Sequence, residues 1–183
     1  VGRRQFSPGG VLPVVRPRFF PMRFLPVLLL IAAVARAALP STAPLRAGAA
    51  TSVITPPLGT PIVGGFAPFP ADDVHDELHA RCLVLDDGQT KLAFVICDLL
   101  GLHRTVSVEA RRLVAASTGI PASNVMVAGT HTHSAGSALG ESRFAYEQPL
   151  NDYQRFVAQR IADGVQRAVR ALRPAEIAFG TVD

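Results

Sequence analysis

The chain has 183 residues, of which 49% are hydrophobic and 17% are charged, and it contains two cysteines and no tryptophan. This length and apolar content suffice for one domain of moderate size and argue against a disordered chain. Two cysteines are too few for a small domain held together by disulfides. The formal net charge of +4 makes the distribution of charge the first question, because nucleic acids bind clustered basic residues.

The basic residues are distributed unevenly along the chain. Residues 1–37 contain six arginines and no acidic residue, whereas residues 38–183 contain 12 basic and 14 acidic residues, a net charge of −2. The longest basic run of this second part is Arg111-Arg112. We therefore predict no nucleic-acid partner, because a nucleic-acid surface needs a patch or stripe of basic side chains.

The arginine-bearing part has the pattern of a secretory signal peptide. Met22-Arg23 precedes an apolar run over 24–34, and Ala35-Arg36-Ala37 follows with the small residues typical of a cleavage site. The run is shorter than the roughly 20 apolar residues that a membrane span needs. A buried hydrophobic helix is the alternative, but Pro26 and the missing polar face fit it poorly.

These patterns divide the chain into four parts. Residues 1–21 are predicted to lie upstream of the true start at Met22, and residues 22–37 are predicted to be a signal peptide that directs the protein to secretion or to the periplasm. Residues 38–46 form a predicted linker, with Pro40, Ser41, Thr42 and Pro44. Residues 47–183 form the predicted domain.

Two strands of the domain are predicted to be joined as a hairpin. Residues 78–85 and 91–99 are strand-like runs, and Asp87-Gly88 between them is a strong signal for a two-residue hairpin loop. Such a loop places Cys82 opposite Ala93. Cys97 is then four residues further along, roughly 13 Å away at about 3.3 Å per residue. This distance exceeds the reach of a disulfide, so the sequence predicts two buried free thiols.

Helices and strands then alternate along the chain. Apolar residues recur at helical spacing over 106–116, and Gly119 stands at the position of a C-cap. Residues 125–128 are wholly apolar, as expected of a strand buried on both faces. A second helix is predicted from a cap at Asn151 or Asp152 until Pro174 ends it, and a last strand over 176–179. The pattern predicts an α/β fold with a mixed sheet that contains an antiparallel hairpin and alternates with helices.

Two histidines follow the apolar strand directly. The run Gly129-Thr130-His131-Thr132-His133-Ser134 lies just beyond the carboxyl end of that strand, where open α/β sheets place their sites. In extended backbone, residues two apart point to the same side, so both rings are predicted to face one ion or one substrate atom. Neutral imidazole is a good zinc ligand. The alternative is a pair of surface or hydrogen-bonded structural histidines.

The same run resembles a motif of the neutral, or neutral/alkaline non-lysosomal, ceramidase family. Further stretches resemble the family in order and spacing, and the resemblance extends from about Leu45 to Thr181. These stretches are the opening strand and turn over 47–59, the glycine-rich Gly64-Gly65-Phe66, the run over 74–81, and the strand over 95–99.

The resemblance implies a secreted zinc amidohydrolase that cleaves the N-acyl bond of ceramide, or of another N-acyl lipid, and that contacts membrane lipid peripherally. It implies that His131 is a zinc ligand and that His133 is a catalytic residue beside the scissile amide. The family completes its zinc site with another His, a Glu and a Tyr much further along the chain. We therefore expect an incomplete catalytic domain with weak zinc affinity and no turnover alone. A non-catalytic secreted remnant or lipid-binding module of the same fold is the alternative.

Three other residues are candidates for supporting roles. Asp98 ends an apolar strand and is predicted to orient a motif histidine, the alternative being a cap of the strand end. Gly64 and Gly65 are candidates for a substrate loop in which backbone amides approach a substrate oxygen. Backbone geometry alone is the alternative explanation for these two glycines.

Overall fold

The computed structural model describes residues 43–65, 67–142 and 144–181. The predicted upstream segment 1–21 and the predicted signal peptide 22–37 lie outside the described residues, as does most of the predicted linker 38–46. The first strand begins at Arg46.

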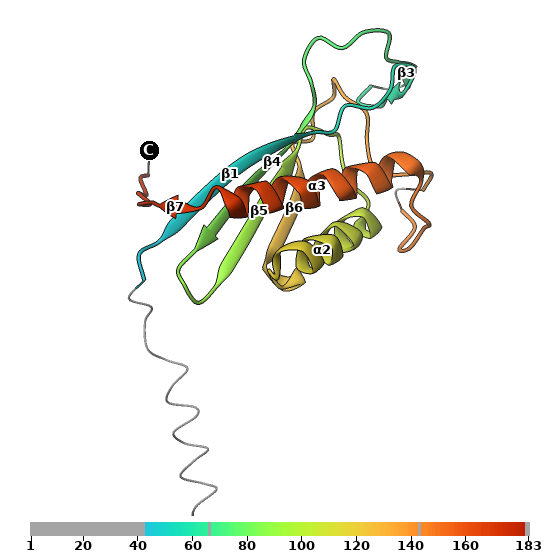
Figure 1. The fold of residues 1–183 in the computed structure, drawn as a ribbon. Helices are drawn as coiled ribbons and strands as arrows, with labels where there is room; N and C mark the ends of the chain where they lie inside the picture. The colour runs from blue at the N-terminus through green and yellow to red at the C-terminus, as the bar shows by residue number, and fades with distance from the viewer. Residues whose placement is uncertain (1–42, 66, 143, 182–183) are drawn as a thin grey trace, which may run out of the picture. The chain divides into compact units, whose positions relative to one another are not determined.

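A mixed sheet forms the centre of the fold, which confirms the predicted α/β class (Figure 1). The strand order is β6-β5-β4-β1-β7, and all neighbouring strands are antiparallel except the parallel pair β5 and β6. A second, small antiparallel sheet pairs β2 with β3. The strands are β1 (Arg46–Val53), β2 (Pro61–Ile62), β3 (Phe69–Pro70), β4 (His79–Asp86), β5 (Lys91–Cys97), β6 (Val125–Gly129) and β7 (Arg173–Pro174).

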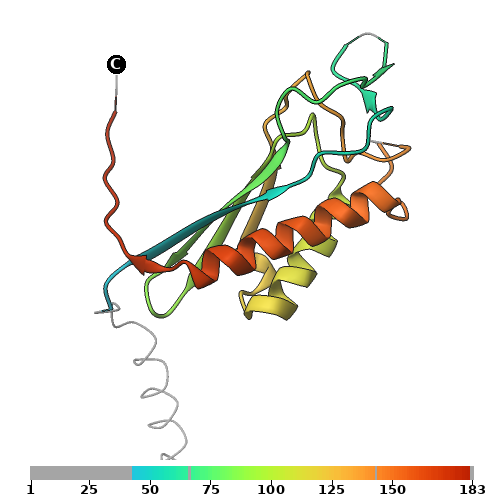
Figure 2. The same ribbon diagram turned by 45° about the horizontal axis from the view of Figure 1, so that its top comes forward.

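Two helices, α2 (Arg104–Thr118) and α3 (Asp152–Arg170), cover one face of the five-stranded sheet, as Figures 1 and 2 show. A short 3-10 turn, η2 (Ala122–Asn124), precedes β6. Alternate residues of β4 and β5 are buried against the helices, among them Val84 and Val95. Gly164 of α3 lies against β4 so closely that a Cβ there would stand 2.6 Å from the Cys82 sulfur. A glycine is therefore required for this helix to approach the sheet.

The helix boundaries follow from their caps. Asn151 caps α3 in a capping box with Gln154, which confirms one of the two predicted cap positions. The other predicted helix begins earlier than expected, because His103 caps α2 and its side chain accepts a hydrogen bond from the Thr105 amide. Gly119 ends α2 at a φ of 74°, which confirms the predicted C-cap.

Two strand predictions were wrong. The strand over 125–128 is not buried on both faces, since Met126 is 44% exposed on the face of the sheet opposite α2 and α3. The strand predicted over 176–179 does not form among the described residues. Instead β7 at Arg173–Pro174 pairs with the start of β1, and the chain beyond it continues without strand structure to residue 181.

The hairpin loop is longer than the two residues predicted. Asp86 pairs with Lys91, so Cys82 lies opposite Val95 rather than Ala93. The Asp87 carboxylate accepts hydrogen bonds from the amides of Gln89 and Thr90, which stabilises a four-residue connection. The consequence drawn for the thiols is nevertheless confirmed, because Cys82 and Cys97 are both free and buried.

Within the described residues, neither helix has the length and apolar character that crossing a membrane requires.

Candidate functional site

The histidine motif lies where β6 ends, and the neighbouring strand holds it in place. The parallel ladder of β5 and β6 continues past the strand ends, with the Thr130 amide donating to the Cys97 carbonyl at 2.9 Å and the His131 amide donating to the Leu99 carbonyl at 3.1 Å. The following segment is tied to the same connection by the Leu100 amide, which donates to the Gly136 carbonyl at 3.2 Å. The motif backbone is therefore fixed on both sides of the histidines.

His131 is held in an unusual conformation. Its φ is 59°, in the left-handed region, and it is the one non-glycine residue with positive φ among the described residues. Such a conformation costs roughly 1 kcal/mol or more and occurs preferentially at functional sites. The Nδ1–H of the ring donates to the Leu100 carbonyl at 2.9 Å. This hydrogen bond fixes the tautomer and leaves Nε2 as an acceptor, the arrangement typical of a metal-ligating histidine.

His133 lies beside His131, with the ring centroids 5.2 Å apart and the planes at 64°. The rings are in contact, but the backbone between them is not the extended one that the sequence predicted, since His131 has a positive φ. Both side chains are exposed. The positive φ of His131 turns the chain, and the edge-to-face contact of the rings replaces the simple same-side arrangement of an extended strand.

Gly64 packs directly against His133. A Cβ built on Gly64 would stand 2.3 Å from both Cα and Cβ of His133 and 2.6 Å from its carbonyl oxygen. By contrast, a Cβ on Gly65 would meet only the Ala67 carbonyl oxygen, at 3.7 Å. The structure thus brings one of the two predicted substrate-loop glycines to the predicted catalytic histidine, where the absence of a side chain allows close backbone approach.

Asp98 makes contacts other than those predicted for it. Its carboxylate accepts a hydrogen bond from the His79 amide at 3.0 Å and forms an ion pair with Arg81, also at 3.0 Å. These partners join β4 to the end of β5, as a strand-end cap would. No hydrogen bond to His131 or His133 is found for this carboxylate among the described residues.

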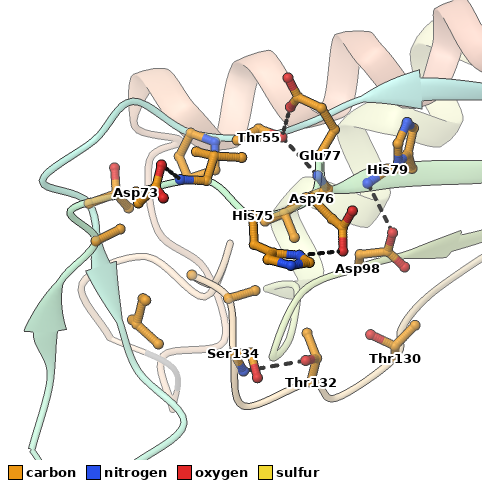
Figure 3. A pocket seen from close by; sticks show the side chains of 18 of the residues that line it. Thr55, Asp73, His75, Asp76, Glu77, His79, Asp98, Thr130, Thr132 and Ser134 are labelled. Atoms are coloured by element: carbon orange, nitrogen blue, oxygen red, sulfur yellow. Dashed lines mark hydrogen bonds and ion pairs between the residues drawn. The ribbon is translucent and has the colours of Figure 1, made fainter.

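A hollow of about 700 Å³ opens on the other side of the motif. Thr130, Thr132 and Ser134 line it, whereas His131 and His133 are not among its lining residues. Figure 3 shows these three side chains along one wall and Asp98, His75 and Glu77 across from them. The motif therefore presents hydroxyl groups to the hollow and imidazoles elsewhere.

Sequence reasoning missed two residues that border this hollow, Thr55 just after β1 and Glu77 just before β4. Thr55 accepts a hydrogen bond from the Leu78 amide at 2.8 Å, and its hydroxyl donates to Glu77. Both lie within the stretches over 47–59 and 74–81 noted from the sequence, but no local signal singles out either residue. For the opposite wall of the hollow, the sequence did contain a signal. Thr130, Thr132 and Ser134 alternate with the two histidines, so the hydroxyl side chains are expected to point away from the imidazoles.

The buried thiols near the motif are not nucleophiles at neutral pH. Cys97 immediately precedes Asp98, and burial, with smaller contributions from Cys82 and Asp98, raises its pKa to about 12. Burial raises the pKa of Cys82 to about 12 as well, against the opposing effect of Arg167. Because the thiolate is the reactive form, both cysteines are structural.

The donor set fits part of a zinc site. Imidazoles are ligands that zinc prefers, and here two lie side by side, one of them oriented by a backbone carbonyl. A catalytic zinc usually takes three protein ligands, and the described residues contain no group of three His, Cys, Asp or Glu side chains that could hold a metal. His131 and His133 can therefore supply at most two of these ligands.

Comparison with known proteins identifies the class to which this fold and motif belong. The profile of neutral/alkaline non-lysosomal ceramidase, N-terminal, matches residues 46–183. The chain therefore belongs to the neutral/alkaline non-lysosomal ceramidase family, as its motifs predicted. A search of curated proteins found no match.

Two solved structures are similar to this chain. A ceramidase complexed with C2 superposes with a TM-score of 0.57 at 23% identity, over 72% of this chain and 22% of that chain. The neutral ceramidase from Pseudomonas aeruginosa superposes with a TM-score of 0.54 at 28% identity, over the same shares of 72% and 22%. The chain thus spans about a fifth of the length of these ceramidases.

Proposed function

We propose that this chain carries the first part of a zinc-dependent amidohydrolase site that cleaves the N-acyl bond of ceramide or a related N-acyl lipid. The observation that carries the proposal is the state of His131. Its backbone is held at positive φ, its Nδ1–H is fixed by the Leu100 carbonyl, and its Nε2 is left as an acceptor. Family membership supplies the reaction class.

In this proposal the two histidines have separate roles. His131 binds the metal through Nε2, and the hydrogen bond at Nδ1 increases the basicity of the ring. His133, whose ring contacts that of His131, donates a hydrogen bond to the amide or transfers a proton at its nitrogen. A bound zinc ion would polarise the amide carbonyl and lower the pKa of a water molecule.

A zinc titration of the purified chain tests the ligand assignment. We expect weak binding by the chain alone, since His131 is the one ligand assigned to it here, and a loss of at least about tenfold in affinity on His131→Ala. The matched control is His75→Ala, because the His75 side chain is 96% exposed and pairs with Asp76. Equal affinity of wild type and His131→Ala would remove the assignment.

A fluorogenic ceramide analogue tests the completeness of the site. With zinc present, we expect no turnover by this chain, because the described residues lack a third ligand at the motif. Robust hydrolysis would overturn this expectation and would mean that residues within the chain complete the site.

Secretion or export to the periplasm is part of the same proposal and rests on the sequence of residues 22–37. N-terminal sequencing of the exported protein checks it, with a mature terminus expected at Ala38. Retention of the intact leader in the cell would contradict it.

A further inference from the structure

The histidine motif is held on both sides by one segment, the connection from β5 to α2 over 98–103. Within the motif, the Nδ1–H of His131 donates to the Leu100 carbonyl at 2.9 Å. Beyond the motif, the Ala138 amide donates to the Gly101 carbonyl, also at 2.9 Å. The orientation of the His131 ring therefore depends on what fixes this connection.

His103, the last residue of the connection, joins three parts of the chain. It is buried, with 4% of its surface exposed. Its amide donates to the Ala138 carbonyl at 3.0 Å, and its Nδ1 accepts a hydrogen bond from the Thr105 amide at 3.2 Å, which caps α2. Its Nε2–H donates to the Ala145 carbonyl at 2.7 Å. One buried residue thus links the segment after the motif, the start of α2 and the segment that contains Ala145.

The two ring nitrogens of His103 have different and fixed roles. A carbonyl oxygen can only accept, so Nε2 carries the proton and Nδ1 is the acceptor for the Thr105 amide. These contacts hold the ring, and the backbone of His103 is extended, with φ at −69° and ψ at 151°. A side chain that caps a helix from this conformation fixes the direction in which the chain enters the helix. The residues just before it, Leu100 among them, are oriented by the same contacts.

We propose that His103 is a positioning residue for His131. It holds the connection over 98–103, and the Leu100 carbonyl of that connection holds the His131 ring in the tautomer that leaves Nε2 as an acceptor. His103 does not line the hollow beside the motif, so it acts through the backbone and not on a ligand. The use of that acceptor to bind a metal rests on the proposed function, whereas the positioning is a property of the metal-free protein.

The test is a measurement of the His131 ring tautomer by nitrogen-15 NMR in the metal-free protein, at about pH 8.5, where ordinary imidazoles are neutral. We expect the Nδ1–H tautomer to dominate in the wild type. In His103→Ala its population relative to the Nε2–H tautomer should fall at least about threefold, because the hydrogen bond to the Leu100 carbonyl is loosened. His103→Asn keeps a side-chain oxygen that can accept from the Thr105 amide, and it should restore most of the Nδ1–H population.

The matched control is Gly119→Ala, which destabilises the opposite end of α2. Gly119 has a φ of 74° and a Cβ there would meet no atom within 4 Å, so the substitution acts through backbone strain alone. It should leave the His131 tautomer unchanged. An unchanged tautomer in His103→Ala, or an equal change in Gly119→Ala, would overturn the proposal.

Zinc titration of the same variants separates this proposal from the proposed function. His103→Ala should weaken zinc binding at least about threefold, which is less than the roughly 10- to 100-fold loss typical of a direct partner of a metal ligand. Gly119→Ala should bind zinc as the wild type does. If His103→Ala changed the tautomer and left zinc affinity unchanged, the positioning role would stand and the ligand role of His131 would fail.

Amide hydrogen exchange of the wild type tests the same link without any variant. The Val106 amide donates to the His103 carbonyl at 3.0 Å at the start of α2, and the His131 amide donates to the Leu99 carbonyl at 3.1 Å. If His103 holds the connection, these two amides should open together, with opening constants that agree within about threefold and rise in parallel with denaturant. Opening of the His131 amide more than about tenfold more frequent than that of Val106 would overturn the proposal.

Discussion

The contact between Gly64 and His133 gives the sharpest test of how the motif is positioned. In Gly64→Ala the new methyl carbon would stand 2.3 Å from two carbon atoms of His133, whereas ordinary contacts begin near 3.4 Å. One of the two segments must therefore move by roughly 1 Å. Overpacking of this kind typically costs about 1–3 kcal/mol.

The matched variant is Gly65→Ala, in which the new methyl carbon meets its nearest atom at 3.7 Å. Neither glycine has a positive φ, so the two substitutions differ in steric contact and not in backbone strain. Gly65→Ala should be neutral or stabilise by up to about 1 kcal/mol, because alanine restricts the unfolded chain.

Thermal unfolding and zinc titration of both variants measure the effect. At about 2–4 °C per kcal/mol for a domain of this size, Gly64→Ala should lower the melting temperature by roughly 2–12 °C. It should also weaken zinc binding, because displacement of His133 disturbs the ring beside His131. If the two variants had the same melting temperature and the same zinc affinity, the assignment of Gly64 as the residue that positions His133 would be wrong.

Two further predictions concern stability. Asn151→Ala removes the oxygen that accepts the Gln154 amide hydrogen bond at 2.8 Å, and should lower the free energy of unfolding by about 1 kcal/mol; Asn151→Asp keeps an accepting oxygen and should lose less, and equal losses in urea denaturation would contradict the cap assignment. The thiols make stability depend on alkaline pH. Burial raises the pKa of Cys82 and Cys97 from 9.0 to about 12, so their contribution is complete below pH 9 and is lost as the pH rises toward 12, at about 1.4 kcal/mol per pH unit for each thiol. Cys82→Ala should remove one thiol's contribution to the loss of unfolding free energy between pH 9 and pH 12. An unchanged pH dependence would refute the burial argument.

The elements that the sequence predicted well are those with strong local signals. Helical periodicity from Asn151 and the glycine after residue 118 located α3 and the end of α2, because caps and amphipathic spacing depend on neighbouring residues. The hairpin was found, but its register was wrong by two residues. Side-chain hydrogen bonds of Asp87 to Gln89 and Thr90 favour the longer loop, and the dipeptide Asp-Gly does not reveal them.

Burial was harder to predict than local structure. Residues 125–128 are apolar throughout, yet β6 has a side open to solvent at Met126 because α2 and α3 cover only one face of the sheet. The last strand was misplaced for a related reason. Arg173 and Pro174 pair with β1 because the chain leaves α3 beside that strand. Strand propensity at 176–179 carries no information about where the chain leaves the helix.

The sequence by itself determined the class of the protein and the position of its motif. The run over 129–134, after an apolar strand, identified the family and its two histidines, since motif residues are contiguous. Only the tertiary structure decided how these residues are used. The contact of Gly64 with His133, the Leu100 carbonyl that fixes His131, and the hollow that Glu77 and Ser134 both line join segments far apart in the chain. Such contacts depend on how strands pair and helices pack, and no local pattern encodes them.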